Sequence, residues 1–183
     1  MKCREKCTII EPYKKRLDKV IIMENNNTNW CQSVTGIVIK DHKVLLARHT
    51  YGPGKGMLIV PGGYVEYGES PQEALKREYL EETHILINPK KVIAIRFNVK
   101  DWYVAFSADY VSGEAVSDHD ENSEVIWIDV EEALIREDVA DLTKKLIKCA
   151  LQEENGFEPI YYVSRSKNGP GTMFGITGKN RKM

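Results

Sequence analysis

The sequence has no long apolar run. A membrane-spanning helix needs about 18 or more mostly apolar residues in succession, and no segment of the chain approaches that length. The N-terminal residues, MKCREKCTIIEPYKKR, also lack the apolar core of a signal peptide. We therefore expect a cytoplasmic protein that has no membrane partner.

Cysteine is scarce and the charge is nearly balanced. The four cysteines are Cys3, Cys7, Cys31 and Cys149, and in the cytoplasm we expect them to be reduced. Cys3 and Cys7 are half of a zinc pattern, but no second close pair follows and a structural zinc site needs four ligands. The formal net charge of -1 gives no general attraction for nucleic acid. We therefore expect neither a zinc site nor a nucleic-acid partner.

Length and composition fit one domain with extra segments at both ends. Of the 183 residues, 42% are hydrophobic and 29% are charged, which is ordinary for a soluble domain. Residues 1–29 are polar and suggest an N-terminal arm, in part disordered. We assign residues 30–154 to the domain and residues 155–183 to a C-terminal extension of two strands and a basic tail.

Strand-like and helix-like segments alternate along the domain. Runs rich in β-branched and aromatic residues predict strands at 31–40, 44–48, 57–60, 85–87, 91–99, 102–111 and 125–128. Helices are predicted at 71–83, from Asp129, and at 138–153. This mixture indicates an α/β (α+β) fold, an α/β/α sandwich with a mixed central sheet between helices.

The most informative segment is GGYVEYGESPQEALKREYLEETHI, residues 62–85. Ser70 is a good N-cap, Pro71 stands at the first helical position, and Glu73 follows three residues after the cap. These three residues form the pattern of a capping box with proline at the first position. The segment therefore predicts a helix that begins at Pro71.

Three carboxylates of this helix occupy an unusual position. At about 100° per residue, Glu78, Glu81 and Glu82 fall on the same side as Ala74 and Leu75. Like charges at these spacings repel, and a solvated helix would place them on the face opposite its apolar residues. The cluster therefore requires a cation, and oxygen ligands alone favour Mg²⁺ or Mn²⁺ over zinc.

The whole segment resembles the Nudix box of the Nudix hydrolase family. The resemblance rests on many fixed positions at fixed spacing, namely Gly63, Glu69, Arg77-Glu78, Glu81-Glu82 and Ile85, preceded by Pro61-Gly62. Two positions depart from the family pattern, because His84 stands where glycine is usual and Tyr79 replaces a smaller aliphatic residue. Histidine adopts the left-handed conformation better than most residues, so we expect His84 to end the helix rather than to bind metal.

The resemblance implies hydrolysis of a nucleoside diphosphate linked to another moiety, X, with Mg²⁺ or Mn²⁺ as cofactor. It implies that Glu78 and Glu82 are the central metal ligands. Glu81 would complete the site, and the backbone carbonyl of Gly63 would be a further ligand. Arg77 is implied to hold Glu69, or a glutamate of the box, in an ion pair beside the metal ligands.

The general base lies in the box or in a later loop according to the same resemblance. In the loop SDHDENSE, Glu121 is the first candidate and Glu124 the second. The alternative for both is an acidic loop that is only solvated. Glu121 is therefore counted with Glu81 and Arg77 among the candidate catalytic residues.

Three residues are candidates for contact with the substrate. The segment GPGKG lacks the spacing of a P-loop, but Lys55 within it and Arg48 just before it are expected to contact phosphate. Tyr103 lies 18 residues after Ile85, a spacing similar to that of a tyrosine in dinucleoside polyphosphate hydrolases. The identity of X stays open between ADP-ribose, a nucleotide sugar, a dinucleoside polyphosphate and a nucleoside triphosphate.

Three functional hypotheses follow. The first is a metal-dependent hydrolase of a small-molecule nucleotide, and the second is a catalytically silent nucleotide-binding or regulatory module of the same fold. The third is an RNA-end processing enzyme, for which the short basic segments 14–16 and 179–182 give little support. The end segments also suggest a homodimer formed by strand addition or exchange.

Overall fold

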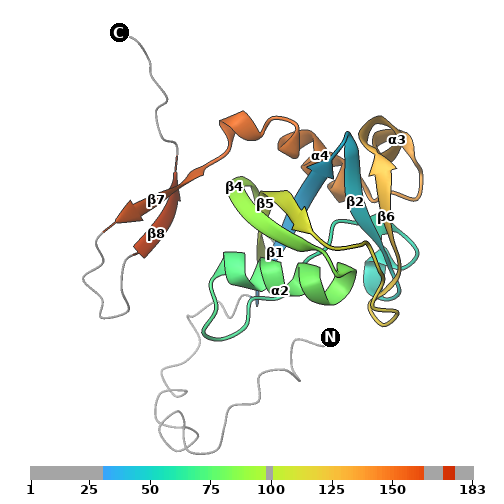
Figure 1. Ribbon diagram of the computed structural model, residues 1–183, viewed down its shortest axis with the longest axis horizontal. Coiled ribbons are helices and arrows are strands. Elements are labelled where there is room, and N and C mark those ends of the chain that lie inside the picture. The colour runs from blue at the N-terminus through green and yellow to red at the C-terminus, as the bar shows by residue number, and fades with distance from the viewer. Residues whose placement is uncertain (1–30, 98–100, 163–170, 176–183) are drawn as a thin grey trace, which may run out of the picture.

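The computed structural model of the chain describes residues 31–97, 101–162 and 171–175 (Figure 1). The predicted N-terminal arm and the basic tail lie outside the described residues. The strands are β1 (Cys31–Lys40), β2 (Lys43–His49), β3 (Leu58–Ile59), β4 (Leu86–Phe97), β5 (Asp101–Ser112), β6 (Asn122–Asp129), β7 (Glu158–Tyr162) and β8 (Gly171–Gly175). The helices are α2 (Pro71–Thr83), α3 (Val130–Ile135) and α4 (Asp141–Ala150), with short 3₁₀ turns at Gly52–Gly54 and Glu153–Asn155.

The central sheet is mixed. Its order is β3-β2-β1-β5-β4, and β6 pairs with β2. Strands β1 and β5 run parallel, whereas β1 with β2, β2 with β6 and β4 with β5 are antiparallel. Strands that follow one another along the chain, β1 with β2 and β4 with β5, thus pair antiparallel.

Helices cover both faces of this sheet. One apolar cluster joins Val34, Val38 and Phe106 of the sheet to Ala74 and Leu75 of α2. The opposite cluster packs α3 and α4 against the other face, through buried side chains that include Ile37, Ala105, Ala133, Leu146 and Ile147. Figure 1 shows α2 on one side of the sheet and α3 with α4 on the other. The predicted α/β/α sandwich is confirmed.

Strand β4 corrects one sequence-based expectation. Two strands were predicted at 85–87 and 91–99, but the chain forms one strand from Leu86 to Phe97 whose pairing with β5 shifts register at three points. Pro89 lies at one of these shifts. A proline is tolerated there because β4 stands at the edge of the sheet, where a backbone donor is dispensable.

The last helix is shorter than predicted. A helix at 138–153 was expected, but α4 covers only Asp141–Ala150. Val139 forms a parallel bridge with Leu58, and the amide N–H of Leu58 donates to the carbonyl of Asp138 at 2.7 Å. Residues 138–140 therefore pair beside β3 instead of starting the helix. No helix among the described residues is long and apolar enough to cross a membrane.

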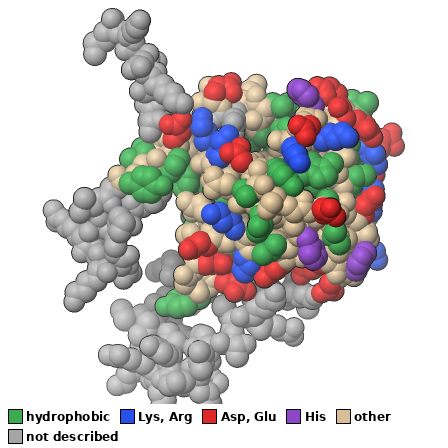
Figure 2. Space-filling model, in the orientation of Figure 1, with side chains coloured by type: hydrophobic (Ala, Val, Ile, Leu, Met, Phe, Trp, Pro, Cys, Tyr) green, Lys and Arg blue, Asp and Glu red, His purple; other side chains and the backbone are tan. Residues whose placement is uncertain are grey.

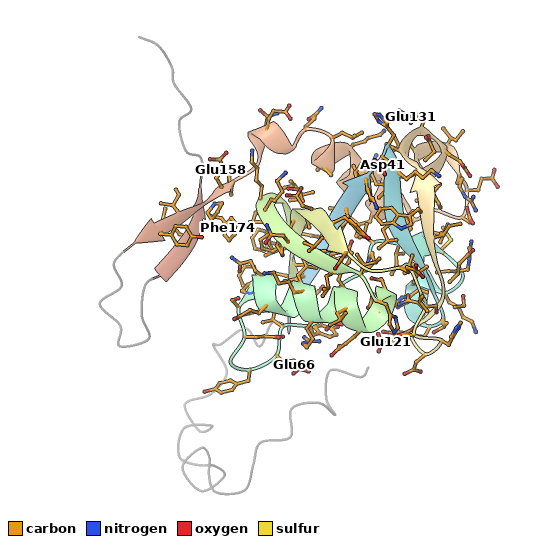
Figure 3. The ribbon with its side chains drawn as sticks, viewed as in Figure 1. Asp41, Glu66, Glu121, Glu131, Glu158 and Phe174 are labelled. Atoms are coloured by element: carbon orange, nitrogen blue, oxygen red, sulfur yellow. The ribbon has the colours of Figure 1, made fainter. Side chains whose placement is uncertain are left out.

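The C-terminal extension forms the two predicted strands. Strands β7 and β8 pair antiparallel as a separate two-stranded sheet. A single antiparallel bridge between Val92 and Phe157 ties the start of β7 to β4. Phe174 of β8 meets Phe106 edge-to-face at 5.4 Å. Figure 3 shows Phe174 on the side of the hairpin that faces the domain.

An ion-pair cluster fixes the segment that leads into α4. Both carboxylate oxygens of Asp138 accept from Arg136 at 2.8 Å, and Arg48 adds a contact at 3.0 Å. Arg136 in first place, and then Arg48, lower the pKa of Asp138 well below its usual value. The carboxylate therefore stabilises the folded state in its ionised form.

Asp138→Asn is expected to lower the melting temperature by about 3 °C at pH 7, because partly exposed ion pairs contribute modestly in a chain of this size. Since the folded-state pKa is depressed, the contribution is present above the unfolded pKa and is lost as pH falls through the folded value. The gap between wild type and variant should therefore narrow below about pH 4. Thermal denaturation at pH 7 and pH 3 measures this, with the exposed Glu114→Gln as control. A constant gap would contradict it.

Candidate active site

Helix α2 begins and ends as its sequence predicts. The hydroxyl of Ser70 accepts from the amide N–H of Glu73 at 3.3 Å, and the Glu73 carboxylate accepts from the amide of Ser70 at 2.7 Å. This reciprocal pair confirms the capping box. At the other end, His84 is left-handed with φ 59°, and its amide N–H donates to the carbonyl of Leu80 at 3.1 Å. His84 thus ends the helix as expected.

Tyr79 has a defined place in the core. Its side chain is fully buried, and its hydroxyl donates to the carbonyl of Gly36 at 2.5 Å. A Cβ at Gly36 would lie only 3.1 Å from the side chains of Tyr79 and Leu75. The glycine in β1 therefore leaves the space that the larger residue of α2 fills.

The segment before α2 lies along β1. The carbonyl of Gly63 accepts from the amide of Val34 at 2.8 Å, and the amide of Val65 donates to the carbonyl of Gln32 at 3.0 Å. The hydroxyl of Thr35 donates to the carbonyl of Pro61 at 2.6 Å. These bonds fix the backbone at 61–65 between the sheet and the acidic side of α2.

Glu82 is a buried carboxylate without a cationic partner among the described residues. Glu82 is only 5% exposed, and the amide N–H of Gly62 donates to its Oε2 atom at 3.3 Å. Burial, and then the negative charge of Glu78, raise the pKa of Glu82 to about 8. A buried carboxylate that stays ionised needs a positive charge close by.

Glu78 packs directly against the backbone of Gly63. A Cβ at Gly63 would lie 2.4 Å from the carboxyl carbon of Glu78, so only glycine leaves room for the carboxylate. Burial raises the pKa of Glu78. The Oε1 atom of Glu78 accepts from Nη1 of Arg77 at 2.8 Å.

Arg77 organises the acidic groups around α2. Its guanidinium pairs with Glu69 at 2.7 Å, with Glu78 at 2.8 Å and with Glu81 at 3.2 Å. It also donates to the carbonyl of Tyr64 at 3.0 Å. The pairing with Arg77 lowers the pKa of Glu69. Arg77 therefore holds Glu69 and two glutamates of the helix in fixed positions.

The side chain of Glu81 does not share the covered face. It is 60% exposed and contacts Arg77, which corrects the helical-wheel expectation that all three glutamates lie on the covered side. Glu81 falls at the margin of that face, where the helix meets solvent rather than the sheet. Figure 2 shows acidic side chains along the edge of the molecule where α2 lies.

The donor set fits a hard divalent cation. Within the described ranges, no three Asp, Glu, His or Cys side chains stand close enough together to hold an ion as they are placed. Glu78 and Glu81 are each paired with Arg77. The unpaired charge of Glu82, next to Glu78 and the Gly63 backbone, is nevertheless what a bound cation would neutralise. All of these donors are oxygens, which Mg²⁺ and Mn²⁺ prefer.

Comparison with known proteins decides the family. A family model described as the NUDIX domain matches residues 31–148. The chain belongs to the Nudix family. The segment from Gly63 to Ile85 is its Nudix box, which confirms the interpretation of the sequence.

Two curated relatives illustrate the similarity. Over 89 residues, 45% of this chain and 53% of the relative, the chain is 35% identical to an ADP-ribose pyrophosphatase of Methanocaldococcus jannaschii. Over 131 residues, 67% of this chain and 48% of the relative, it is 31% identical to the NAD-capped RNA hydrolase NudC of Haemophilus influenzae. The chain therefore spans about half the length of these relatives.

A solved structure shows the same fold. The crystal structure of a NUDIX hydrolase from Nitrosomonas europaea matches with a TM-score of 0.62 at 22% identity, over 70% of this chain and 73% of that one. At this identity the likeness extends to the fold alone.

The two candidates for the general base of this Nudix domain lie in different surroundings. Glu124 pairs with Nε of Arg48 at 2.8 Å. Glu121 accepts from the hydroxyl of Tyr51 at 2.8 Å, and its negative charge is among the causes that raise the pKa of Glu82. Figure 3 shows Glu121 near the C-terminal end of α2.

The three residues expected to contact substrate differ in their contacts and in their exposure. The guanidinium of Arg48 is occupied by Glu124, Asp138 and the carbonyl of Gly56. Lys55 is exposed in the turn between β2 and β3. Tyr103 packs against the cluster under α3 and α4, with Arg96 over its ring at 4.7 Å, and burial raises the pKa of Tyr103 to about 12. Lys55 is thus the most accessible of the three.

Tyr51 could not be identified as a site residue from the sequence. No motif marks this residue, and its contact with Glu121 joins positions that are 70 residues apart. The pairing of β2 with β6, through the register His49 with Asn122, brings the two segments together.

Proposed function

We propose that this protein is a metal-dependent hydrolase that cleaves a pyrophosphate bond in a nucleoside diphosphate linked to another moiety. One observation carries the proposal, namely the buried and unpaired carboxylate of Glu82 beside Glu78 within a Nudix box. A solvated surface helix would not bury such a charge, because burial without compensation is costly.

Glu78, Glu82 and the carbonyl of Gly63 would hold Mg²⁺ or Mn²⁺, and Glu81 would complete the set after it leaves Arg77. A bound divalent ion stabilises negative charge on the phosphate oxygens and acidifies bound water. Arg77 keeps Glu69 and the box glutamates aligned through its ion pairs. This alignment matters because a small displacement of ligands lowers the rate of reaction.

Glu121 is assigned the general base. Its carboxylate takes a proton from the attacking water, whose oxygen forms a bond to phosphorus as the bond from phosphorus to the bridging oxygen breaks. Two phosphate products leave. The position of Glu121 near the C-terminal end of α2 supports this assignment over Glu124, which Arg48 already neutralises.

The relatives set the choice of substrates to test. One is named an ADP-ribose pyrophosphatase and the other an NAD-capped RNA hydrolase. ADP-ribose and NAD both contain a nucleoside diphosphate joined to a second group. Similarity to the second relative also favours RNA-end processing as the alternative function.

The function is tested with a panel of ADP-ribose, a nucleotide sugar, a dinucleoside polyphosphate, a nucleoside triphosphate, NAD and NAD-capped RNA. Each is incubated with the protein in Mg²⁺, in Mn²⁺ and in excess chelator, and products are separated by chromatography. We expect cleavage of at least one compound with metal and none with chelator, because the charge at the box then lacks compensation. Nucleotide binding by calorimetry with no cleavage would instead indicate a silent module.

A further inference from the structure

The loop between β5 and β6 is fixed by its own side chains. The carboxylate of Asp118 accepts from the backbone amides of Asp120, Glu121 and Asn122 at 3.0 to 3.2 Å. The hydroxyl of Ser117 donates to the carbonyl of Asn122 and accepts from the amide N–H of His119. The backbone that carries Glu121 is therefore set before any ligand binds.

The end of β2 anchors this loop from outside. The amide of Thr50 donates to the carbonyl of Glu121 at 3.0 Å. The hydroxyl of Thr50 lies 2.8 Å from the carbonyl of Asp120 and 2.9 Å from that of Glu121. These contacts hold the main chain of Glu121, but they do not determine which rotamer its side chain adopts.

Electrostatic repulsion acts against the inward position of that side chain. Figure 3 shows Glu121 near the C-terminal end of α2, the helix that carries Glu78 and Glu82, and negative charges on nearby carboxylates repel one another. A glutamate near the surface would relieve this repulsion by turning toward water. An additional contact is needed to keep the Glu121 carboxylate facing α2.

Tyr51 provides that contact. Its hydroxyl donates to Oε2 of Glu121 at 2.8 Å, and its ring packs on His49 with centroids 4.3 Å apart. Tyr51 is 41% exposed, and partial burial in first place, and then the bond to Glu121, raise its pKa. The phenol thus remains a donor across the neutral range.

We propose that Tyr51 is a positioning residue that holds the Glu121 carboxylate toward the Nudix box. The inference rests on the proposed function, in which Glu121 is the general base. Tyr51 donates one hydrogen bond to a charged acceptor, and such a bond is stronger than one between neutral groups. This bond selects the rotamer from which Glu121 reaches the attacking water.

The test is a double-mutant cycle with Tyr51→Phe and Glu121→Gln, measured on whichever compound the wild type cleaves. Tyr51→Phe is expected to lower kcat about tenfold and to leave KM within about twofold, since the hydroxyl acts on the base rather than on the substrate. In the Glu121→Gln background, Tyr51→Phe should have no further effect, because coupled residues are not additive. Tyr67→Phe, at the fully exposed Tyr67, is the matched control.

The outcomes separate the inference from the proposed function. If Glu121→Gln lowers kcat and Tyr51→Phe leaves it unchanged, the inference is wrong and the proposed function stands. Equal losses from Tyr51→Phe in both backgrounds would show that Tyr51 acts independently of Glu121, which also overturns it. If the wild type cleaves nothing in the panel, the proposed function fails and the inference fails with it.

Discussion

Glu82→Gln is expected to lower kcat by at least about a thousandfold, since removal of a charge that binds the catalytic cation removes much of the electrostatic stabilisation. Without metal, the same change should leave the melting temperature equal or higher. Glutamine keeps the shape of Glu82 but cannot ionise, so folding no longer carries the cost of burial and of repulsion with Glu78 that raises the pKa of Glu82. Activity and stability should therefore move in opposite directions.

Steady-state kinetics and thermal denaturation, each with and without Mg²⁺ or Mn²⁺, measure this prediction. The ions should raise the melting temperature of the wild type, because a ligand that binds the folded state stabilises it, and should raise that of Glu82→Gln much less. Glu73→Gln on the same helix is the control, since glutamine also serves in a capping box. A Glu82→Gln variant within tenfold of wild-type kcat would exclude Glu82 as a metal ligand.

The box and its helix could be predicted because their signals are local. Ser70, Pro71 and Glu73 set the helix start within four residues, and His84 ends it at a position where the chain turns left-handed. The burial of Glu82 followed from its angle around the helix. The exposure of Glu81 did not, because a helical wheel gives the direction of a side chain but not the edge at which the sheet stops covering the helix.

Features that depend on pairing between residues far apart in the chain could not be predicted from the sequence. Asp138 reads as a helix residue by pattern, yet its backbone pairs with β3 and its carboxylate binds Arg48 and Arg136. Pro89 suggests a break between strands, yet pairing with β5 carries the strand past it. In both cases, contacts across the sheet outweigh the local propensity.

The adjacent glycines of the box entry should respond to alanine in different ways. Gly62 has φ +148°, and a Cβ there would lie 2.2 Å from the carbonyl oxygen of Val34 and 2.7 Å from Cα of Thr35. These are backbone atoms of a central strand and have no room to move. Gly62→Ala is therefore expected to destabilise the fold by about 3 kcal/mol or more, from strain and steric overlap together.

Gly63→Ala should preserve the fold and impair the site. The atom that a Cβ at Gly63 would meet is the carboxyl carbon of Glu78, the far end of a flexible side chain that can rotate away at small cost. The displaced carboxylate then no longer lies beside Glu82, and kcat is expected to fall about a hundredfold, as for other misplaced catalytic groups. The melting temperature should stay within about 3 °C of wild type, which corresponds to less than about 1 kcal/mol.

Thermal denaturation and kcat measurements on both variants test this contrast. Gly54→Ala is the control, because a Cβ at Gly54 would meet nothing closer than 3.9 Å. A Gly63→Ala variant with full activity would show that the position of Glu78 against the backbone is not required for catalysis. A Gly62→Ala variant as stable as the wild type would show that the backbone at 61–63 can shift away from β1. The two variants thus distinguish the role of Gly62 in the stability of the fold from the role of Gly63 in the placement of the Glu78 carboxylate.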